Sequence, residues 1–74
     1  MLIHVRAVAQ AMAAVGGGRT VEAPDGCMLY AFLPLIGLSR AAPYLYVVNG
    51  LAVHGDMALH DGDELAVVPL LEAG

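Results

Sequence analysis

Lysine and tryptophan are absent from this 74-residue chain, and cysteine, serine and threonine each occur once. Without lysine the chain has no residue for Schiff-base chemistry, no phosphate-binding P-loop and no lysine acceptor for conjugation. The single cysteine, Cys27, excludes an internal disulfide and a Cys-x-x-Cys zinc or redox motif. We therefore interpret Cys27 as a small, partly buried apolar residue.

Nucleophiles for catalysis are equally scarce. Ser39 and Thr20 are the only hydroxyl residues of their kinds, and neither lies in a nucleophile-elbow pattern. Cys27 has no histidine at a fixed spacing that would mark a catalytic pair. The sequence thus predicts a protein without an active site of its own.

Positive charge is also sparse, because three arginines face seven acidic residues and give a net charge of −4. Nucleic acids and anionic membranes are poor partners for such a chain. No stretch approaches the roughly 18 apolar residues that cross a bilayer. The N-terminus lacks a basic start followed by a clean apolar core, so we expect no signal peptide and a cytoplasmic protein.

What the chain does have is apolar residues, which make up 59% of it, against 14% charged residues. This balance excludes a disordered chain. The length permits one domain with a small core. We place that domain at residues 1–69 and expect a flexible C-terminal tail at residues 70–74.

Short segments with apolar residues at alternate positions predict a set of strands: 2–8, 19–23, 44–48, 51–53 and 65–68. Segment 44–48 is apolar on both faces and is therefore expected inside the sheet. The first strand pairing with the last is a natural way to close such a sheet. Pro69 is expected to leave the ladder of hydrogen bonds, since proline has no backbone donor.

One helix is predicted from an apolar stripe at positions i, i+3, i+4 and i+7, formed by Leu29, Phe32, Leu33 and Ile36. Pro34 lies inside this stripe and removes a backbone donor, so the helix should be short or kinked. Gly37 suits its end. Residues 9–15 are alanine-rich and compatible with another helix, followed by a glycine connection at 16–18.

Tight turns are predicted at Asp25-Gly26, Asn49-Gly50 and Asp61-Gly62. Strands at both ends of the chain with one main helix between them indicate an α+β fold. The expected architecture is a mixed sheet of four to five strands with the helix packed across one face.

Residues 48–74 carry a more specific pattern. It consists of Val48-Asn49-Gly50, a following valine at 53, Asp56, the run Leu59 to Leu65 containing Asp61-Gly62-Asp63-Glu64, then Pro69 and a terminal glycine. This pattern resembles the MoaD/ThiS family of ubiquitin-like sulfur carriers. The opening of the chain, Val5 to Gln10, and its long connection to the second strand are closer to the molybdopterin-synthase small subunit than to the thiamine carrier.

The resemblance implies a ubiquitin-like β-grasp fold and a chemical role for the last residue, Gly74. An activating enzyme would adenylate its carboxylate with ATP, and a sulfur donor would convert the adenylate into a thiocarboxylate. The sulfur would pass to a synthase subunit that makes molybdopterin, to the thiazole of thiamine, or to another sulfur metabolite. The chain itself would bind no cofactor.

Recognition of the tail is expected at its other residues. Glycine passes through a narrow channel and adopts any backbone conformation. Pro69 would stiffen the exit from the sheet, and Leu70 and Leu71 would anchor the tail in an apolar groove. Ala73 replaces the first glycine of the family's Gly-Gly ending, which keeps open a second hypothesis of a protein-binding module that is never activated.

Cys27 is a second departure from the family's pattern, because it replaces the usual Thr or Ser cap of the helix.

Partner docking is expected at exposed apolar residues beside the helix stripe, namely Met28, Tyr30 and Leu35, which could also support weak self-association. The acidic residues Asp56, Asp61, Asp63 and Glu64 either steer a basic partner surface or only form a soluble face. With His54 and His60 they match no zinc or calcium spacing, so we expect no metal site.

Overall fold

Five strands and one short helical segment are described by the computed structural model, which covers residues 1–7, 18–39 and 44–69. The strands are β1 (Leu2–Ala7), β2 (Arg19–Glu22), β3 (Tyr44–Val48), β4 (Leu51–Val53) and β5 (Glu64–Pro69). The helical segment consists of α2 (Leu29–Phe32) followed directly by the 3-10 helix η1 (Leu33–Ile36). No helix within these ranges is long and apolar enough to span a membrane.

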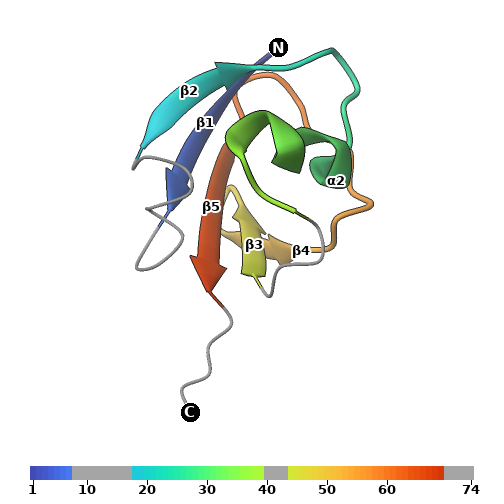
Figure 1. Cartoon of the computed structure of the whole chain (residues 1–74). Helices are drawn as coiled ribbons and strands as arrows, with labels where there is room; N and C mark the ends of the chain where they lie inside the picture. The colour runs from blue at the N-terminus through green and yellow to red at the C-terminus, as the bar shows by residue number, and fades with distance from the viewer. Residues whose placement is uncertain (8–17, 40–43, 70–74) are drawn as a thin grey trace.

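The strands form one mixed sheet in the order β2-β1-β5-β3-β4. The first and last strands, β1 and β5, pair in parallel, and every other neighbouring pair is antiparallel. The predicted pairing of the first strand with the last is therefore confirmed. The helical segment lies across one face of this sheet (Figure 1), which confirms the predicted α+β architecture.

The core lies between the helical segment and the inner face of the sheet. In β1 the alternation is complete: Ile3, Val5 and Ala7 are buried, whereas Leu2, His4 and Arg6 are exposed. The residues with fully buried side chains come from both layers and from the 54–63 loop: Ile3, Leu29, Phe32, Leu33, Ile36, Leu59, Leu65 and Val67. All four residues of the predicted helical stripe are among them, as a stripe that faces a sheet requires.

Pro34 sets the length of the helical segment. The α-helical part ends at Phe32, and the chain continues as a tighter 3-10 turn that carries Pro34 in its first positions. A proline is tolerated there because no intrahelical donor is needed. Gly37 ends the segment in the left-handed conformation, with φ of 82°. The short, interrupted helix and its glycine end are as predicted.

The N-cap of this segment corrects one detail of the sequence reading. The N-cap residue is Met28 rather than Cys27, and no side chain caps it. Cys27 lies one residue earlier, where its carbonyl accepts the backbone N–H of Leu59. Met28 instead forms an isolated β-bridge with Ala58. Backbone bonds to the 54–60 loop thus hold the start of the helix in place of a side-chain cap.

The β3–β4 hairpin closes through a two-residue turn, as Asn49-Gly50 predicts. Asn49 and Gly50 both have positive φ, 52° and 86°. Two positive φ values in a two-residue loop make the type I′ turn that matches strand twist. Gly26 and Gly62, with φ of 77° and 85°, form the other two predicted turns, after Asp25 and Asp61.

Pro69 does not leave the ladder, contrary to the sequence prediction. It is the last residue of β5 and lies opposite Tyr44 of β3. The N–H of Asn49 donates to Glu64 O, so the backbone N–H and C=O of Glu64 point toward β3. Because successive residues of a strand point these groups to opposite neighbours, the other even-numbered residues of β5 also direct theirs toward β3. The nitrogen of Pro69 is directed toward β1, beyond the last register pair, Ala7 with Val67. The missing donor therefore costs no bond to β3.

The predicted helix at residues 9–15 and most of the glycine connection lie outside the described residues. The boundary between a domain at 1–69 and a tail at 70–74 also depends on residues outside them. Both stay predictions.

A core truncation tests how the two layers are held together. Phe32 is fully buried, so Phe32→Ala should lower the free energy of unfolding by about 3–5 kcal/mol. That is a large part of the roughly 5–15 kcal/mol typical of a whole domain. Leu35, three residues on and 47% exposed, is the matched control, and Leu35→Ala should change stability little. Urea unfolding of both variants makes the comparison, and equal losses would contradict this packing.

Candidate functional site

The place where the C-terminal segment leaves the sheet is the first part of the candidate site. The central strand β5 carries the chain through the middle of the sheet to Pro69. The remaining predicted tail residues lie outside the described residues: Leu70, Leu71, Ala73 and Gly74. What the structure defines is the root of this segment, with Val68 and Pro69 paired to Leu45 and Tyr44.

The beginning of β5 is fastened by the side chain of Asn49. Its Oδ1 accepts the backbone N–H of Glu64 at 2.9 Å, and its Nδ2 donates to Asp63 Oδ1 at 2.9 Å. The backbone N–H of Asn49 also donates to Glu64 O at 2.9 Å. One turn residue thus makes two bonds to the first residue of the strand that leads to the C-terminus and one to the residue before it.

Asp63 is the centre of this polar network and is only 8% exposed. Its second oxygen, Oδ2, accepts the backbone N–H of His60 at 2.8 Å. Both carboxylate oxygens are therefore used inside the domain, as burial of a charged group requires. This burial argues against the predicted docking role of Asp63, and we assign the residue to the fold.

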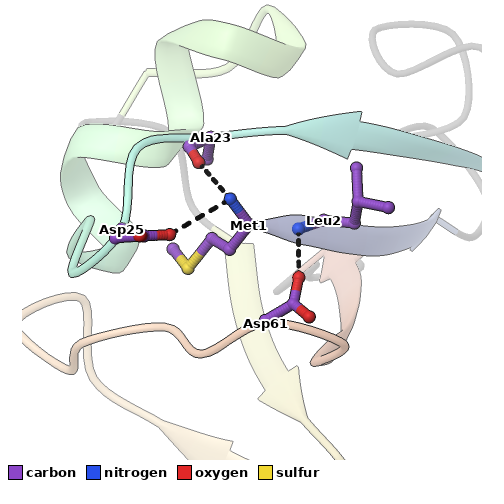
Figure 2. A network of polar contacts seen from close by, with 5 residues as sticks. All are labelled: Met1, Leu2, Ala23, Asp25 and Asp61. Carbon is purple, nitrogen blue, oxygen red and sulfur yellow. Dashed lines mark hydrogen bonds and ion pairs between the residues drawn. The ribbon is translucent and has the colours of Figure 1, made fainter.

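Asp61 anchors the N-terminal strand rather than standing free. Its Oδ1 accepts the backbone N–H of Leu2 at 2.7 Å, and the N–H of Gly62 donates to Leu2 O at 2.8 Å. Figure 2 shows this contact beside the N-terminal amine of Met1, which donates to Ala23 O at 2.8 Å and lies 3.3 Å from Asp25 Oδ1. Asp61 is nevertheless exposed to solvent, so a docking role for it stays a prediction.

These bonds explain the spacing of the sequence pattern in residues 48–64. The Asn-Gly turn and the Asp-Gly-Asp-Glu turn meet at one end of β5 and join it to β1 and β3. Pro69 is at the other end of the same strand. The motif residues therefore form the anchor of the central strand, and the C-terminal segment starts at its opposite end.

The predicted docking residues near the helix differ in exposure. Met28 and Leu35 are 43% and 47% exposed, so both remain available to a partner. Tyr30 is half-buried, and its backbone N–H donates to Gly55 O at 2.9 Å. Its ring lies where a Cβ on residue 55 would be, so the absence of a side chain at Gly55 makes room for it.

Tyr30 forms one wall of a pocket that sequence reasoning missed. All three tyrosines of the chain line it, together with Leu45, Ala52, Val53, His54 and Gly55, and its volume is about 250 Å³. We call it the tyrosine pocket. Tyr30 is too far in sequence from Tyr44 and Tyr46 for any spacing rule to bring them together. The only hint of the pocket in the sequence was that three of the four aromatic residues are tyrosines.

Tyr46 lines the tyrosine pocket, but its hydroxyl oxygen is buried. The residue is 6% exposed, and its hydroxyl has no hydrogen-bond partner among the residues described. Burial raises the pKa of the Tyr46 hydroxyl, and the nearby hydroxyls of Tyr30 and Tyr44 raise it further. The group therefore stays a neutral phenol well above physiological pH.

The outer face of the sheet contains a second hollow, of about 230 Å³, lined mainly by β1, β3 and β5. Its charged members are His4, Arg6 and Glu64, and its apolar members include Val47 and Ala66. No described segment covers this face. Leu45 and Leu51, which lie on it or at its edge, are accordingly exposed. The sequence signal, apolar residues on both faces of 44–48, predicted an interior strand correctly but not a bare face.

No group of three or more potential metal ligands occurs within residues 1–7, 18–39 and 44–69. The nearest approach to one is His60 Nδ1, which lies 3.9 Å from Asp63 Oδ2. That carboxylate is already bonded to backbone and amide groups.

Substitutions of Asn49 test the anchor. Asn49→Gly removes the side-chain bonds but keeps an easy positive φ, whereas Asn49→Ala also forces alanine into that conformation. We expect Asn49→Gly to cost about 1–3 kcal/mol, because Asp63 Oδ1 and the backbone N–H of Glu64 each lose the bond to the Asn49 side chain. Asn49→Ala should cost about 1 kcal/mol more. Thermal unfolding measures both, and an Asn49→Gly protein as stable as the wild type would show that the network contributes nothing.

Alkaline pH tests the environment of Tyr46. Because the pKa of its hydroxyl is raised in the folded protein, the unfolded chain loses this proton first as pH rises above its ordinary value of 10.0. Stability should be complete below that pH and fall above it. In Tyr46→Phe the fall should be shallower, and stability at pH 7 should be equal or higher, since no bond is lost. Identical alkaline slopes for the two proteins would contradict the burial of this hydroxyl.

Comparisons with known proteins find matches to the fold of this chain but not to its sequence. No protein-family model and no curated protein matches the chain. Solved structures do match over nearly all of it. They include SAMP1 of Haloferax volcanii, with a TM-score of 0.79, 19% identity and 100% coverage of both chains. Urm1 of Trypanosoma brucei gives a TM-score of 0.75 and 15% identity, covering 99% of this chain and 95% of that one.

A third match is a putative molybdopterin converting factor, subunit 1, from Pyrococcus furiosus. Its TM-score is 0.79 at 23% identity, with coverage of 96% of this chain and 99% of that one. At the level of the fold, these structures confirm the resemblance drawn from residues 48–74. The chain has the β-grasp fold of the small ubiquitin-like proteins.

Proposed function

We propose that this chain is a sulfur carrier, a co-substrate of other enzymes rather than an enzyme itself. The observation that carries the proposal is the course of β5. The motif residues anchor its first residue, and Pro69 ends it five positions before the terminal glycine. If extended, five residues span about 17 Å. That is enough for the terminus to enter the active site of a partner while the domain stays outside.

The chemistry belongs to the carboxylate of Gly74. A free carboxylate is a poor acyl donor, so an activating enzyme first joins it to AMP from ATP and releases pyrophosphate. A donor that supplies hydrosulfide then attacks the acyl carbon, AMP leaves, and a thiocarboxylate remains. Glycine suits this role because no side chain obstructs a narrow channel. Leu70 and Leu71 would hold the tail in an apolar groove, and Ala73 would lie next to the reacting group.

The recipient of the sulfur that we favour is a synthase subunit of molybdopterin biosynthesis. The likeness to the Pyrococcus furiosus structure and the opening Val5 to Gln10 support this choice. A carrier for the thiazole of thiamine, or for another sulfur metabolite, uses the same carboxylate chemistry and is the alternative. Met28 and Leu35, both exposed, are the docking residues we propose for these partners, and we propose Asp61 as a further contact.

A second candidate is a protein-binding module on the same fold that is never activated. Ala73 favours it, because a methyl group at the penultimate position narrows the backbone conformations available in a tight channel. In that case function would reside in exposed apolar residues of the domain.

Mass spectrometry separates the two. Protein incubated with its activating enzyme, ATP and a sulfur source should gain the mass difference between one sulfur and one oxygen, located at Gly74. Deletion of Gly74 should abolish the gain and leave the thermal unfolding midpoint unchanged, since the residue lies beyond β5. If only Ala73→Gly gains sulfur and the wild type does not, the binding-module function stands instead.

A further inference from the structure

The only asparagine of the chain lies in the dipeptide Asn49-Gly50, at the exposed turn between β3 and β4. Asparagine before glycine is the pair that loses side-chain ammonia most readily, because glycine has no side chain to keep its backbone nitrogen away from the amide. Apart from its chain neighbours, no atom lies within 4 Å of the place where a Cβ on Gly50 would be. The turn is therefore open to the water that such a reaction needs.

The fold requires the same two residues that make the turn reactive. Asn49 and Gly50 both have positive φ, 52° and 86°, and asparagine tolerates this region better than most residues with a side chain. The amide of Asn49 also fastens the beginning of β5 through Asp63 and Glu64. A less reactive residue at position 49 would weaken the turn, the anchor or both.

The reaction at this turn is an intramolecular deamidation. The backbone nitrogen of Gly50 attacks Cγ of Asn49 and gives its proton to a base in the solvent, and Nδ2 leaves as ammonia. A five-membered succinimide ring remains. Water then opens the ring at one of its two carbonyl carbons and leaves either aspartate or isoaspartate. One water is consumed and one ammonia is released, with no change of oxidation state.

In the folded chain both polar atoms of the reacting amide are engaged. Oδ1 accepts the backbone N–H of Glu64 and Nδ2 donates to Asp63 Oδ1, each at 2.9 Å. Asp63 is only 8% exposed, so its bond to Nδ2 is partly sheltered from water. The amide has to give up these bonds before its carbon can close a ring with Gly50. Deamidation is therefore confined to molecules in which the turn has opened locally.

The product of the reaction is unable to restore the anchor. An aspartate at position 49 presents an oxygen in place of Nδ2, which lies 2.9 Å from Asp63 Oδ1. Two carboxylates at such a distance repel each other, and more strongly where one of them is buried. The basic side chain that the described residues place against Asp63 is His60, 3.9 Å from the other oxygen, Oδ2. Isoaspartate additionally inserts a methylene group into the main chain of a two-residue turn.

We propose that Asn49 is a self-modification site: the folded network protects it, opening of the turn lets it deamidate, and the aspartate formed prevents β5 from being fastened again. The single asparagine thus limits the lifetime of the folded domain. This inference goes beyond the sulfur-carrier function and stands without it.

Mass spectrometry tests the protection. The full chain is kept at mildly alkaline pH in buffer and in unfolding guanidinium chloride, and conversion at position 49 is followed by peptide mapping. Gln10 is the only other side-chain amide, so it serves as the internal reference. Conversion of Asn49 should be about tenfold slower or more in the folded chain than in the unfolded one. Equal rates in the two solutions would overturn the proposal.

A variant of the network shows whether the bond to Asp63 provides this protection. Asp63→Ala leaves Nδ2 without its acceptor and should speed conversion of Asn49 in buffer several-fold. Asp56→Ala removes an exposed carboxylate that makes none of these bonds, so it is the matched control with the wild-type rate. A folded Asp63→Ala protein that converts at the wild-type rate contradicts the role of the network. If that variant does not fold, the comparison in guanidinium chloride decides.

A reciprocal exchange tests the consequence of the reaction. Asn49→Asp imitates the product and should lower the thermal unfolding midpoint by about 5–15 °C. The double variant Asn49→Asp/Asp63→Asn has the net charge of the wild type. It can also make all three side-chain bonds, because the amide at position 63 now donates to the carboxylate at position 49 and still accepts the N–H of His60. It should therefore regain most of the loss. An Asn49→Asp protein as stable as the wild type, or a double variant no more stable than Asn49→Asp, would refute the inference.

Discussion

The bond between the amide of Asn49 and the buried carboxylate of Asp63 is the contact on which the rest of this small domain depends. It joins the β3–β4 turn to the beginning of the central strand, and the backbone of Glu64 completes the connection. A carboxylate that is 8% exposed needs bonds to its oxygens, so each of the two turns stabilises the other. The domain is small and its hydrophobic core correspondingly limited. A polar network of this kind therefore selects one register for β5, because a slip of one residue would exchange its two faces.

Fixing β5 in this way fixes the position from which the C-terminal segment starts. The strand has its anchored end at Glu64 and its free end at Pro69, and its flanking strands β1 and β3 hold it on both sides. In the proposed carrier the anchor takes no part in the chemistry. It keeps the root of the tail in a constant place relative to the surface that a partner contacts, so that recognition of the domain delivers the terminal carboxylate to the same point each time. The tyrosine pocket adjoins that root through Tyr44, whereas the hollow on the outer face lies at the anchored end of β5.

Much of the fold could be predicted from the sequence, because periodicity and turn chemistry are local signals. The alternation in residues 2–7, the stripe from Leu29 to Ile36 and the three Gly-containing turns each indicated the element that the structure has. Pro69 was misjudged because the cost of a missing donor depends on which neighbour it would face, and only the register of β5 decides that. Cys27 was misplaced by one residue because the loop at 54–60, rather than a side chain, holds the start of the helix. The burial of Asp63 and the tyrosine pocket escaped prediction for a shared reason: both are set by tertiary packing, which no spacing in the chain encodes.

The central claim is that the end of β5 presents a carboxylate for activation by another protein. Pyrophosphate exchange tests it most directly, by measuring the return of labelled pyrophosphate into ATP with the activating enzyme and this chain present. The account predicts rapid exchange with the native chain and none with a semisynthetic chain whose Gly74 carries a C-terminal amide. Exchange that is the same for both chains, or that occurs with neither, would contradict it.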